Sequence, residues 1–385
     1  MMRPVKCGID VVMEKPEVFQ NLRLGLITNY TGVNQNLKST IDILHQYGHL
    51  TCLFAPEHGV RGNVQAGDHV EDYVDEKTGV QVYSLYGKNR KPNAEMVKDI
   101  DAFVFDIQDV GVRYYTYLYT MAYAMEAAKE FNKKIFVLDR PNPLGGEIIE
   151  GNVLEEVYSS FVGLYPIPVR YGLTIGELAY LFNKEFHIDC DLEVIPLEGW
   201  KREMNFEDTG LSFIAPSPNI PTMNTAFLYT GTCLFEGTNV SEGRGTTQPF
   251  EVIGAPWIRG EELAEQLNQR KMEGILFRPH YFTPTFSKHK GELCQGIQIH
   301  IQDRHHVQPF KVGVSIVQAI VSTYKEFEIL PSPKGRGRCF FDLLAGTDQL
   351  QKAIKENRVE QYLKQCEEQR KEFNKIREKY LMYSN

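Results

Sequence analysis

The sequence lacks the features that mark membrane and exported proteins. No apolar run approaches the roughly 18 residues that a membrane-spanning helix needs. The N-terminal stretch MMRPVKCGIDVVMEKP contains no apolar core of the kind that a secretory signal carries. The chain as written is therefore expected in the cytoplasm, whereas a periplasmic or secreted protein whose signal had been trimmed would look the same.

A basic surface and a disulfide framework are also missing. The formal net charge of −8 argues against nucleic-acid binding, which normally requires an excess of lysine and arginine. The seven cysteines are odd in number and include no C-x-x-C pair. We therefore predict buried, reduced thiols rather than disulfides.

The short motifs of cofactor and metal enzymes are absent as well. No G-x-G-x-x-G follows the first predicted strand, and no Walker A sequence occurs anywhere, so a nucleotide cofactor is not expected. The ten histidines form no H-E-x-x-H motif, and there is no G-x-S-x-G elbow for a serine nucleophile. We predict an enzyme that works without a cofactor and without a metal.

The sequence does contain regularly alternating strands and helices in its first part. Continuous apolar runs at 22–28, 49–54, 101–107 and 134–138 alternate with helical patterns at 39–47 and 115–132. This alternation predicts a parallel sheet covered on both faces. The predicted fold class is α/β, with a Rossmann-like parallel-sheet domain that lacks the dinucleotide fingerprint, plus a smaller α/β domain.

The second part of the chain has a different pattern. Helices are predicted at 174–186, 261–270 and 308–327, strands at 192–196, 250–253, 276–281 and 297–301, and two amphipathic helices at the end. A chain of 385 residues suggests two domains. We expect a catalytic domain over 1–155 and a second domain over 156–385 that completes a cleft.

Polar side chains follow each predicted strand of the first domain. Ligands bind beyond the carboxyl ends of the strands in open parallel sheets, and right-handed crossovers place these ends on one edge. The residues at these ends are Asn29, Glu57, His58, Asp106, Gln108, Asp109, Asp139, Arg140 and Asn142. They are therefore candidates for a shared pocket.

Each candidate also has a purely structural interpretation. Asn29 is more typical of a turn or a helix cap than of a ligand contact. Glu57 is harder to explain in this way, because neither caps nor turns favour glutamate after a proline, and His58 beside it suits an orienting role. Helical spacing assigns Tyr115, with two later tyrosines, to the core, which leaves Tyr114 as the better ligand candidate.

A second group of candidates lies in FEGTNVSEGRGTT, residues 235–247. Three glycines allow the backbone of this segment to approach a ligand closely, and it carries Glu236, Asn239, Glu242 and Arg244. The alternative is a solvated glycine-rich turn. The proline-rich segment APSPNIPT presents Asn219 to the same cleft. Carboxylates and arginines in a polar cleft suit glycoside cleavage, in which an acid protonates the leaving oxygen.

Several long sequence blocks carry a resemblance to a known family. GLITNYTGV, FAPEHGVRG, VYSLYGKNRKP, VFDIQDVGVRYYTY, LDRPNPLGG and GTCLFEGTNVSEGRGTTQPFE resemble the NamZ (YbbC-like) family of exo-β-N-acetylmuramidases. The resemblance implies a Rossmann-like domain, a smaller α/β domain and an active site between them. It also implies release of N-acetylmuramic acid (MurNAc) from the non-reducing end of peptidoglycan fragments such as MurNAc-GlcNAc, with Glu57 as the catalytic glutamate.

The sequence thus predicts a glycosidase that acts on peptidoglycan-derived disaccharides or glycan chain ends, with Glu57 as general acid. The other predicted catalytic candidates are His58, Asp106, Asp139 and Glu242. The predicted substrate-binding residues are Asn29, Arg61, Gln108, Arg113, Tyr114, Arg140, Asn142, Asn219, Glu236, Asn239 and Arg244. Two alternatives remain open, a hexosaminidase acting on GlcNAc and a non-catalytic muropeptide-binding protein.

Overall fold

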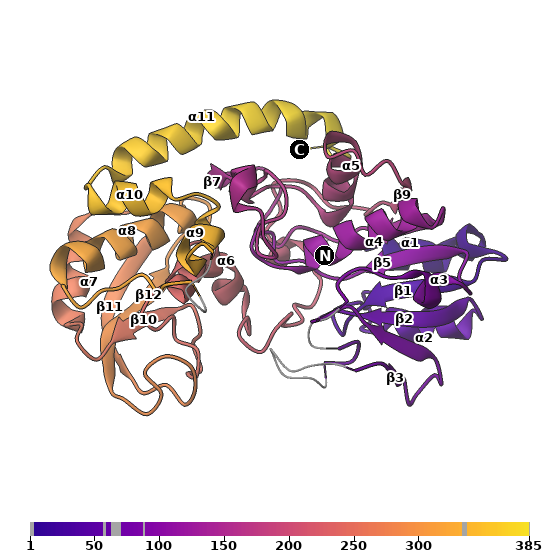
Figure 1. The fold of residues 1–385 in the computed structure, drawn as a ribbon, viewed down its shortest axis with the longest axis horizontal. Helices are drawn as coiled ribbons and strands as arrows, with labels where there is room; N and C mark the ends of the chain where they lie inside the picture. The colour runs from indigo at the N-terminus through magenta and orange to yellow at the C-terminus, as the bar shows by residue number, and fades with distance from the viewer. Residues whose placement is uncertain (1–3, 57–58, 63–70, 88, 333–336, 385) are drawn as a thin grey trace.

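The protein has two lobes, each built around its own β-sheet, and the long helix α11 (Val359–Arg377) runs across both (Figure 1). This architecture comes from a computed structural model that describes residues 4–56, 59–62, 71–87, 89–332 and 337–384. None of the helices within these ranges is long and apolar enough to cross a membrane.

The first lobe contains a seven-stranded sheet in the order β3-β4-β2-β1-β5-β6-β9. Every neighbouring pair is parallel except β3 with β4. The predicted α/β fold with a parallel sheet is confirmed at this level. The strands are β1 (Leu24–Thr28), β2 (Leu50–Ala55), β3 (Tyr73–Val74), β4 (Gln81–Ser84), β5 (Ala102–Asp106), β6 (Lys134–Leu138) and β9 (Asp191–Ile195).

Both faces of this sheet are covered, which explains why its strands are continuously apolar. Along β5, Phe103 and Phe105 belong to one hydrophobic cluster, whereas Val104 belongs to a cluster on the opposite face. This is the alternation expected of a strand buried on both sides. The helices of this lobe are α1 (Gly8–Glu14), α2 (Thr40–Gln46), α3 (Ala94–Val97), α4 (Tyr117–Glu130) and α5 (Ile175–Glu185).

Strand β9 lies well beyond the predicted domain boundary at residue 155. It pairs with β6 and completes the edge of the first sheet. The sheet therefore draws on residues from both sides of that boundary. Between β6 and β9 the chain forms a separate two-stranded ribbon of β7 (Glu150–Val153) and β8 (Pro168–Arg170).

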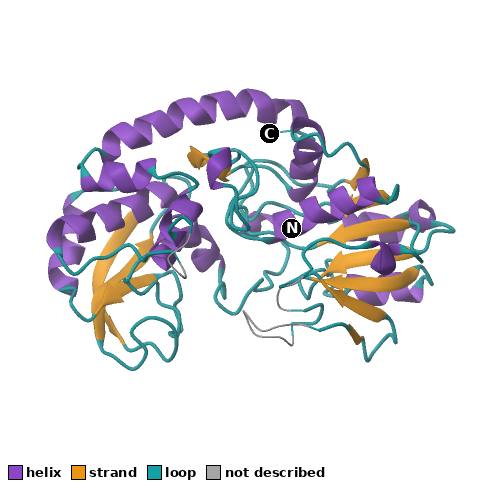
Figure 2. Cartoon of the chain, in the orientation of Figure 1, coloured by secondary structure: helices purple, strands orange, loops and turns teal. Residues whose placement is uncertain are grey.

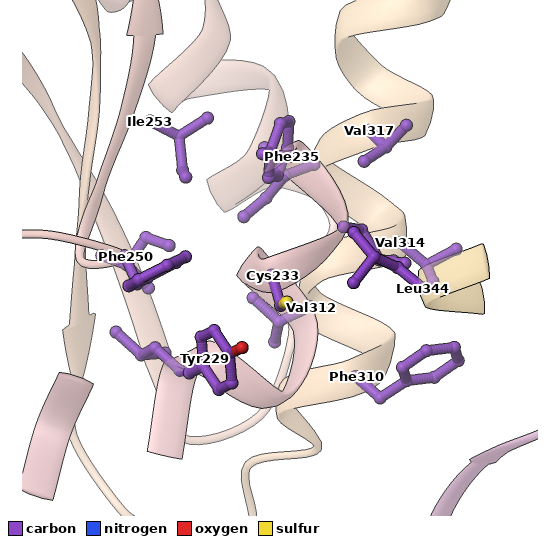
Figure 3. Close-up of a cluster of buried hydrophobic side chains, with 14 of the residues drawn as sticks. Tyr229, Cys233, Phe235, Phe250, Ile253, Phe310, Val312, Val314, Val317 and Leu344 are labelled. Atoms are coloured by element: carbon purple, nitrogen blue, oxygen red, sulfur yellow. The ribbon is translucent and has the colours of Figure 1, made fainter. Parts of the chain in front are cut away.

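The second lobe holds a three-stranded antiparallel sheet in the order β10-β12-β11, with helices packed against it (Figure 2). Its strands are β10 (Val252–Ala255), β11 (Ile275–Phe282) and β12 (Cys294–Ile301), and its helices are α6 (Met223–Thr232), α7 (Gly260–Gln269), α8 (Pro309–Thr323), α9 (Phe340–Ala345) and α10 (Gln349–Lys355). Figure 3 shows how Tyr229, Phe235 and Phe250 enter the same apolar core as Val314 of α8.

The C-terminal segment ties the two lobes together. Helix α11 packs along β7, and at its end the Arg377 guanidinium donates to the Gly146 carbonyl at 2.6 Å. Beyond the helix, the Tyr383 hydroxyl donates to Asp139 at the end of β6, at 2.5 Å.

All seven cysteines are free, and six of them are buried, so the prediction of reduced buried thiols is confirmed.

Candidate active site

A cavity of about 190 Å³ lies where the two lobes meet. The first lobe contributes one residue that follows β4 and a run of residues that ends at the start of α4, and the β7–β8 connection adds two more. The second lobe contributes residues from α6, from the short helix η4 (Cys233–Gly237) and its following loop, and from α9. The lining residues are Tyr86, Tyr114, Tyr115, Thr116, Tyr117, Phe161, Val162, Ser217, Tyr229, Glu236, Arg244 and Phe340.

Aromatic rings form most of the cavity wall. The rings of Tyr114 and Tyr229 meet edge to face with centroids 5.7 Å apart, and those of Phe161 and Phe340 are stacked at 6.5 Å. The Tyr114 hydroxyl donates to the Thr230 carbonyl, which fixes its ring against α6. Rigid aromatic walls with a few polar groups suit a ligand that has apolar faces and a polar rim, as a sugar ring has.

A pair of opposite charges stands at one side of the cavity. Arg244 Nη2 donates to Glu236 Oε1 at 3.0 Å, and the guanidinium lies over the ring of Phe250 at 5.1 Å. Burial raises the pKa of the Glu236 carboxyl above its ordinary value, although the Arg244 charge opposes the shift. A carboxyl with a raised pKa next to a cavity is typical of groups that exchange protons in catalysis.

Glu242 lies behind this pair rather than in the cavity wall. Its side chain is only 2 % exposed, against 20 % for Glu236. Lys288 Nζ lies 2.7 Å from one of its carboxylate oxygens, and Arg244 Nε lies 3.4 Å from the other. Of the two glutamates predicted in this segment, Glu236 is thus the one that reaches the cavity.

Glu57 and His58 lie outside the described residues. In the sequence they follow β2 after one intervening proline, and the last residue of β2, Ala55, is in register with Ser84 of β4. Tyr86, two residues beyond Ser84, lines the cavity. The catalytic assignment of Glu57 and His58 therefore stays a prediction.

Asp106 and Arg140 face each other at the carboxyl edge of the sheet. Arg140 Nε lies 2.6 Å from one carboxylate oxygen and Nη2 lies 2.9 Å from the other, and both side chains are buried. The Thr40 hydroxyl also donates to Asp106. Gln108 and Arg140 border a hollow of only about 20 Å³, which is smaller than a sugar and separate from the cavity described above.

The other predicted residues of this edge hold loops in place. Asn29 accepts from the backbone and hydroxyl of Thr31, and Asn142 donates to the Leu173 carbonyl at 2.8 Å. Asp139 accepts hydrogen bonds from Thr174 and from the backbone of Gly176. These side chains are buried, and none of the three predicted residues lines the cavity.

Three further residues predicted to bind substrate make their contacts with other parts of the protein and do not line the cavity. The guanidinium of Arg113 is fully buried and donates to backbone carbonyls of both lobes, including Ile167 and Ala345. Arg61 pairs with Asp75 at 2.6 Å. Asn239 donates to the Glu326 carbonyl.

Asn219 is buried in the loop that ends at α6, and its backbone N–H donates to Ser217 Oγ at 3.2 Å. Of its loop, Ser217 lines the cavity and Asn219 does not. The substrate-binding predictions that coincide with the cavity wall are therefore Tyr114, Glu236 and Arg244.

Comparisons with known proteins cover the whole of this architecture. Residues 24–224 match the N-terminal region, and residues 227–383 the C-terminal region, of the exo-β-N-acetylmuramidase NamZ family. The chain belongs to this NamZ family. It is 54 % identical over 384 residues to the peptidoglycan β-N-acetylmuramidase NamZ of Bacillus subtilis strain 168, covering 98 % of this chain and 91 % of that protein.

Two crystal structures of DUF1343 family proteins from Bacteroides fragilis NCTC 9343 share the fold. One has a TM-score of 0.89 at 40 % identity, and the other 0.78 at 31 % identity. Both match across 100 % of each chain. The two-lobed architecture is thus shared with both of these solved structures.

Taken singly, several cavity residues carry no sequence signal of a binding role. Tyr86, Phe161, Tyr229 and Phe340 carry no charge and read as ordinary core positions. Helical spacing predicts Tyr115 in the core stripe of a helix, but α4 begins at Tyr117, so Tyr115 precedes the helix and reaches the cavity. A signal for Tyr86 was available, because it lies in the block VYSLYGKNRKP that resembles the NamZ family.

Proposed function

We propose that this protein is an exo-acting glycoside hydrolase that releases MurNAc from the non-reducing end of peptidoglycan fragments such as MurNAc-GlcNAc. The observation that carries the proposal is the match to both NamZ regions, together with the 54 % identity to the Bacillus subtilis enzyme over 98 % of the chain. The aromatic cavity with Glu236 and Arg244 supplies a site of suitable chemistry.

We further propose that the first lobe is Rossmann-like. Its parallel strands, taken along the sheet as β4-β2-β1-β5-β6-β9, follow the 3-2-1-4-5-6 order of that fold. The lobe carries Glu57, whereas Glu236 and Arg244 come from the second lobe. The active site is thus completed by both lobes. The division at residue 155 stays a prediction.

The proposed chemistry uses two carboxyl groups. Glu57 is the general acid that protonates the leaving glycosidic oxygen. Glu236 is the second carboxyl group, because among the described residues it is the carboxylate in the cavity wall. In an inverting reaction it activates a water molecule, and in a substrate-assisted reaction it holds the N–H of the 2-acetamido group.

Incubation with MurNAc-GlcNAc and detection of free MurNAc tests the function. The Glu57→Gln variant is expected to lose roughly 10²–10⁴-fold in rate through loss of proton donation, with an unchanged circular dichroism spectrum. An aryl MurNAc glycoside with a good leaving group should suffer less, because it needs little protonation. Glu76→Gln, at an exposed position of the first lobe, is the matched control.

Three outcomes contradict parts of the proposal. A Glu57→Gln variant that keeps most of its activity on the disaccharide removes Glu57 from the acid role. Equal turnover of GlcNAc-GlcNAc by the wild type would indicate a hexosaminidase. Binding of MurNAc-GlcNAc without release of a sugar would indicate a muropeptide-binding protein.

A further inference from the structure

The loop between β11 and β12, residues 283–293, packs directly on the loop that carries Glu236 and Arg244. The backbone N–H and the hydroxyl of Thr285 both donate to the Gly245 carbonyl at 2.9 Å. A ring nitrogen of His289 lies 2.7 Å from the Asn239 carbonyl. The backbones are so close that a Cβ on Gly245 would lie 2.6 Å from the Phe286 carbonyl oxygen.

Lys288 is at the centre of this contact. Its ammonium group lies 2.6 Å from the Phe235 carbonyl, 3.0 Å from that of Thr238 and 2.8 Å from that of Val240. It also lies 2.7 Å from the Glu242 carboxylate. The three N–H donors of the ammonium go to the three carbonyls, and the Glu242 carboxylate next to Arg244 is held by its charge.

The backbone around Lys288 is held in a rarely populated conformation. Ser287 and His289, on either side of it, have φ angles of 68° and 55°. Residues other than glycine seldom adopt this left-handed region, and they do so where surrounding contacts determine the conformation. Here Thr285, Lys288 and His289 make such contacts with the loop that carries Glu236 and Arg244.

We propose that Lys288 is a positioning residue for the cavity carboxyl group Glu236, and that Glu242 acts with it by holding Arg244. The inference rests on the proposed function, since it assigns Glu236 a part in glycoside cleavage. Lys288 does not line the cavity itself. It acts by fixing the loop over residues 235–242, so that Glu236 and Arg244 are presented to the substrate from a rigid backbone.

The charged groups around Glu236 act on the pKa of its carboxyl in opposite directions. Glu236 is faced by Arg244 and Lys288, which lower its pKa, and by Glu242, which raises it. Cys233, Tyr229 and Tyr114 lie in its surroundings, and burial keeps all three neutral by raising their pKa values. Removal of the Lys288 charge should therefore raise the pKa of Glu236, and removal of the Glu242 charge should lower it.

The test compares Lys288→Met, Lys288→Arg and Glu242→Gln with the matched control Lys290→Met, an exposed lysine of the same loop. The readouts are kcat and KM on MurNAc-GlcNAc and the pH profile of kcat/KM. We expect Lys288→Met to lower kcat roughly 10- to 100-fold with a smaller change in KM, because a misplaced catalytic group slows the reaction more than it weakens binding.

The limb of the pH profile that reports the titration of Glu236 is expected to move to higher pH in Lys288→Met and to lower pH in Glu242→Gln. Lys288→Arg keeps the charge, so its limb should stay near the wild-type position. A loss of packing alone would not move the limb in opposite directions in two variants. Should Lys288→Met fail to fold, the charge argument is still tested by Glu242→Gln, whose limb should move to lower pH while that of Lys288→Arg stays near the wild-type position.

Two results would overturn the inference. One is a Lys288→Met enzyme whose kcat and pH profile match those of Lys290→Met. The other is a limb that stays fixed, or that moves the same way in Lys288→Met and Glu242→Gln. A wild-type protein without activity on MurNAc-GlcNAc would instead refute the proposed function, so the two failures are distinguishable.

Discussion

Arg140 and Asp106 form a buried ion pair through two contacts, with Arg140 Nε 2.6 Å from Asp106 Oδ1 and Nη2 2.9 Å from Oδ2. The side chains are 4 % and 0 % exposed. The pair joins the ends of β5 and β6, and the Arg140 guanidinium also reaches the Val33 carbonyl at 2.8 Å. Both residues are thus held by each other at the point where the sequence predicted a substrate pocket.

The first prediction is that Asp106→Ala mainly destabilises the fold. It leaves the Arg140 charge buried without its partner, and loss of one member of a buried ion pair typically costs about 3–5 kcal/mol of unfolding free energy. Denaturant unfolding measures the loss. Glu262→Ala, which breaks the exposed pair with Arg259, should have a much smaller effect. Equal effects of the two variants would contradict the structural role of Asp106.

The second prediction concerns the choice between MurNAc and GlcNAc. MurNAc differs from GlcNAc by a lactyl group that carries a carboxylate. Of the four arginines predicted to bind substrate, Arg244 is the one that lines the cavity. A guanidinium binds a carboxylate through parallel hydrogen bonds, and a hydrogen bond to a charged group contributes about 1.5–3 kcal/mol. Arg244→Met should therefore narrow the preference for MurNAc-GlcNAc over GlcNAc-GlcNAc roughly 10- to 100-fold.

Arg61→Met is the control for this selectivity test, because Arg61 pairs with Asp75 and Asp42 away from the cavity. The ratio of kcat/KM for the two disaccharides is the quantity to compare. If Arg244→Met keeps the wild-type ratio, recognition of the lactyl group depends on shape or on other donors.

The third prediction is a pH dependence of stability due to Asp109. Its carboxyl is buried, and among the described residues Oδ1 has no hydrogen-bond partner. Burial raises the pKa of Asp109 to about 6. Between pH 4 and pH 6 the folded state therefore keeps a proton that the unfolded chain has released. Stability falls as pH rises through this window, by roughly 3 kcal/mol.

Asp109→Asn should remove this fall and leave the protein more stable than the wild type above pH 6. Denaturant unfolding at several pH values between 4 and 8 measures the difference. Asp99→Asn, at an exposed position, is the control and should follow the wild-type curve. Parallel curves for the wild type and Asp109→Asn would refute the buried, protonated carboxyl.

The fourth prediction is activity without a metal or a nicotinamide. Among the described residues, no group of three or more His, Cys, Asp or Glu side chains is arranged to hold a metal ion. We expect full activity on MurNAc-GlcNAc after dialysis against EDTA. Recovery of lost activity on addition of Zn²⁺ or NAD would contradict this prediction.

Local signals made parts of the fold predictable. Strand β6 was predicted at 134–138 and occurs at Lys134–Leu138. Helix α5 was predicted at 174–186 and occurs at Ile175–Glu185. It begins with a capping box, in which Thr174 Oγ1 accepts from the Glu177 backbone and the Glu177 carboxylate accepts from the Thr174 backbone. Strand β4 was missed, because its four residues QVYS are too short and too mixed in polarity to stand out.

The site was less predictable for a physical reason. Buried polar side chains at strand ends satisfy one another, as Asp106 and Arg140 do, or satisfy loops, as Asn142 does. In the sequence such residues look the same as residues that face a ligand. The glycine-rich segment 235–247 was recognisable because its density of distinct polar types is unusual for a turn.

The sequence by itself determined the α/β class, the parallel sheet, the reduced cysteines and, through its long motif blocks, the NamZ family. These depend on local periodicity and on residue identity, which a linear sequence records. Only the tertiary structure decided that β9 returns to the first sheet, that Glu236 rather than Glu242 reaches the cavity, and that Lys288 holds the loop between them. Lys288 lies about fifty residues beyond the carbonyls that it binds, and contacts over such a separation are set by the packing of two loops.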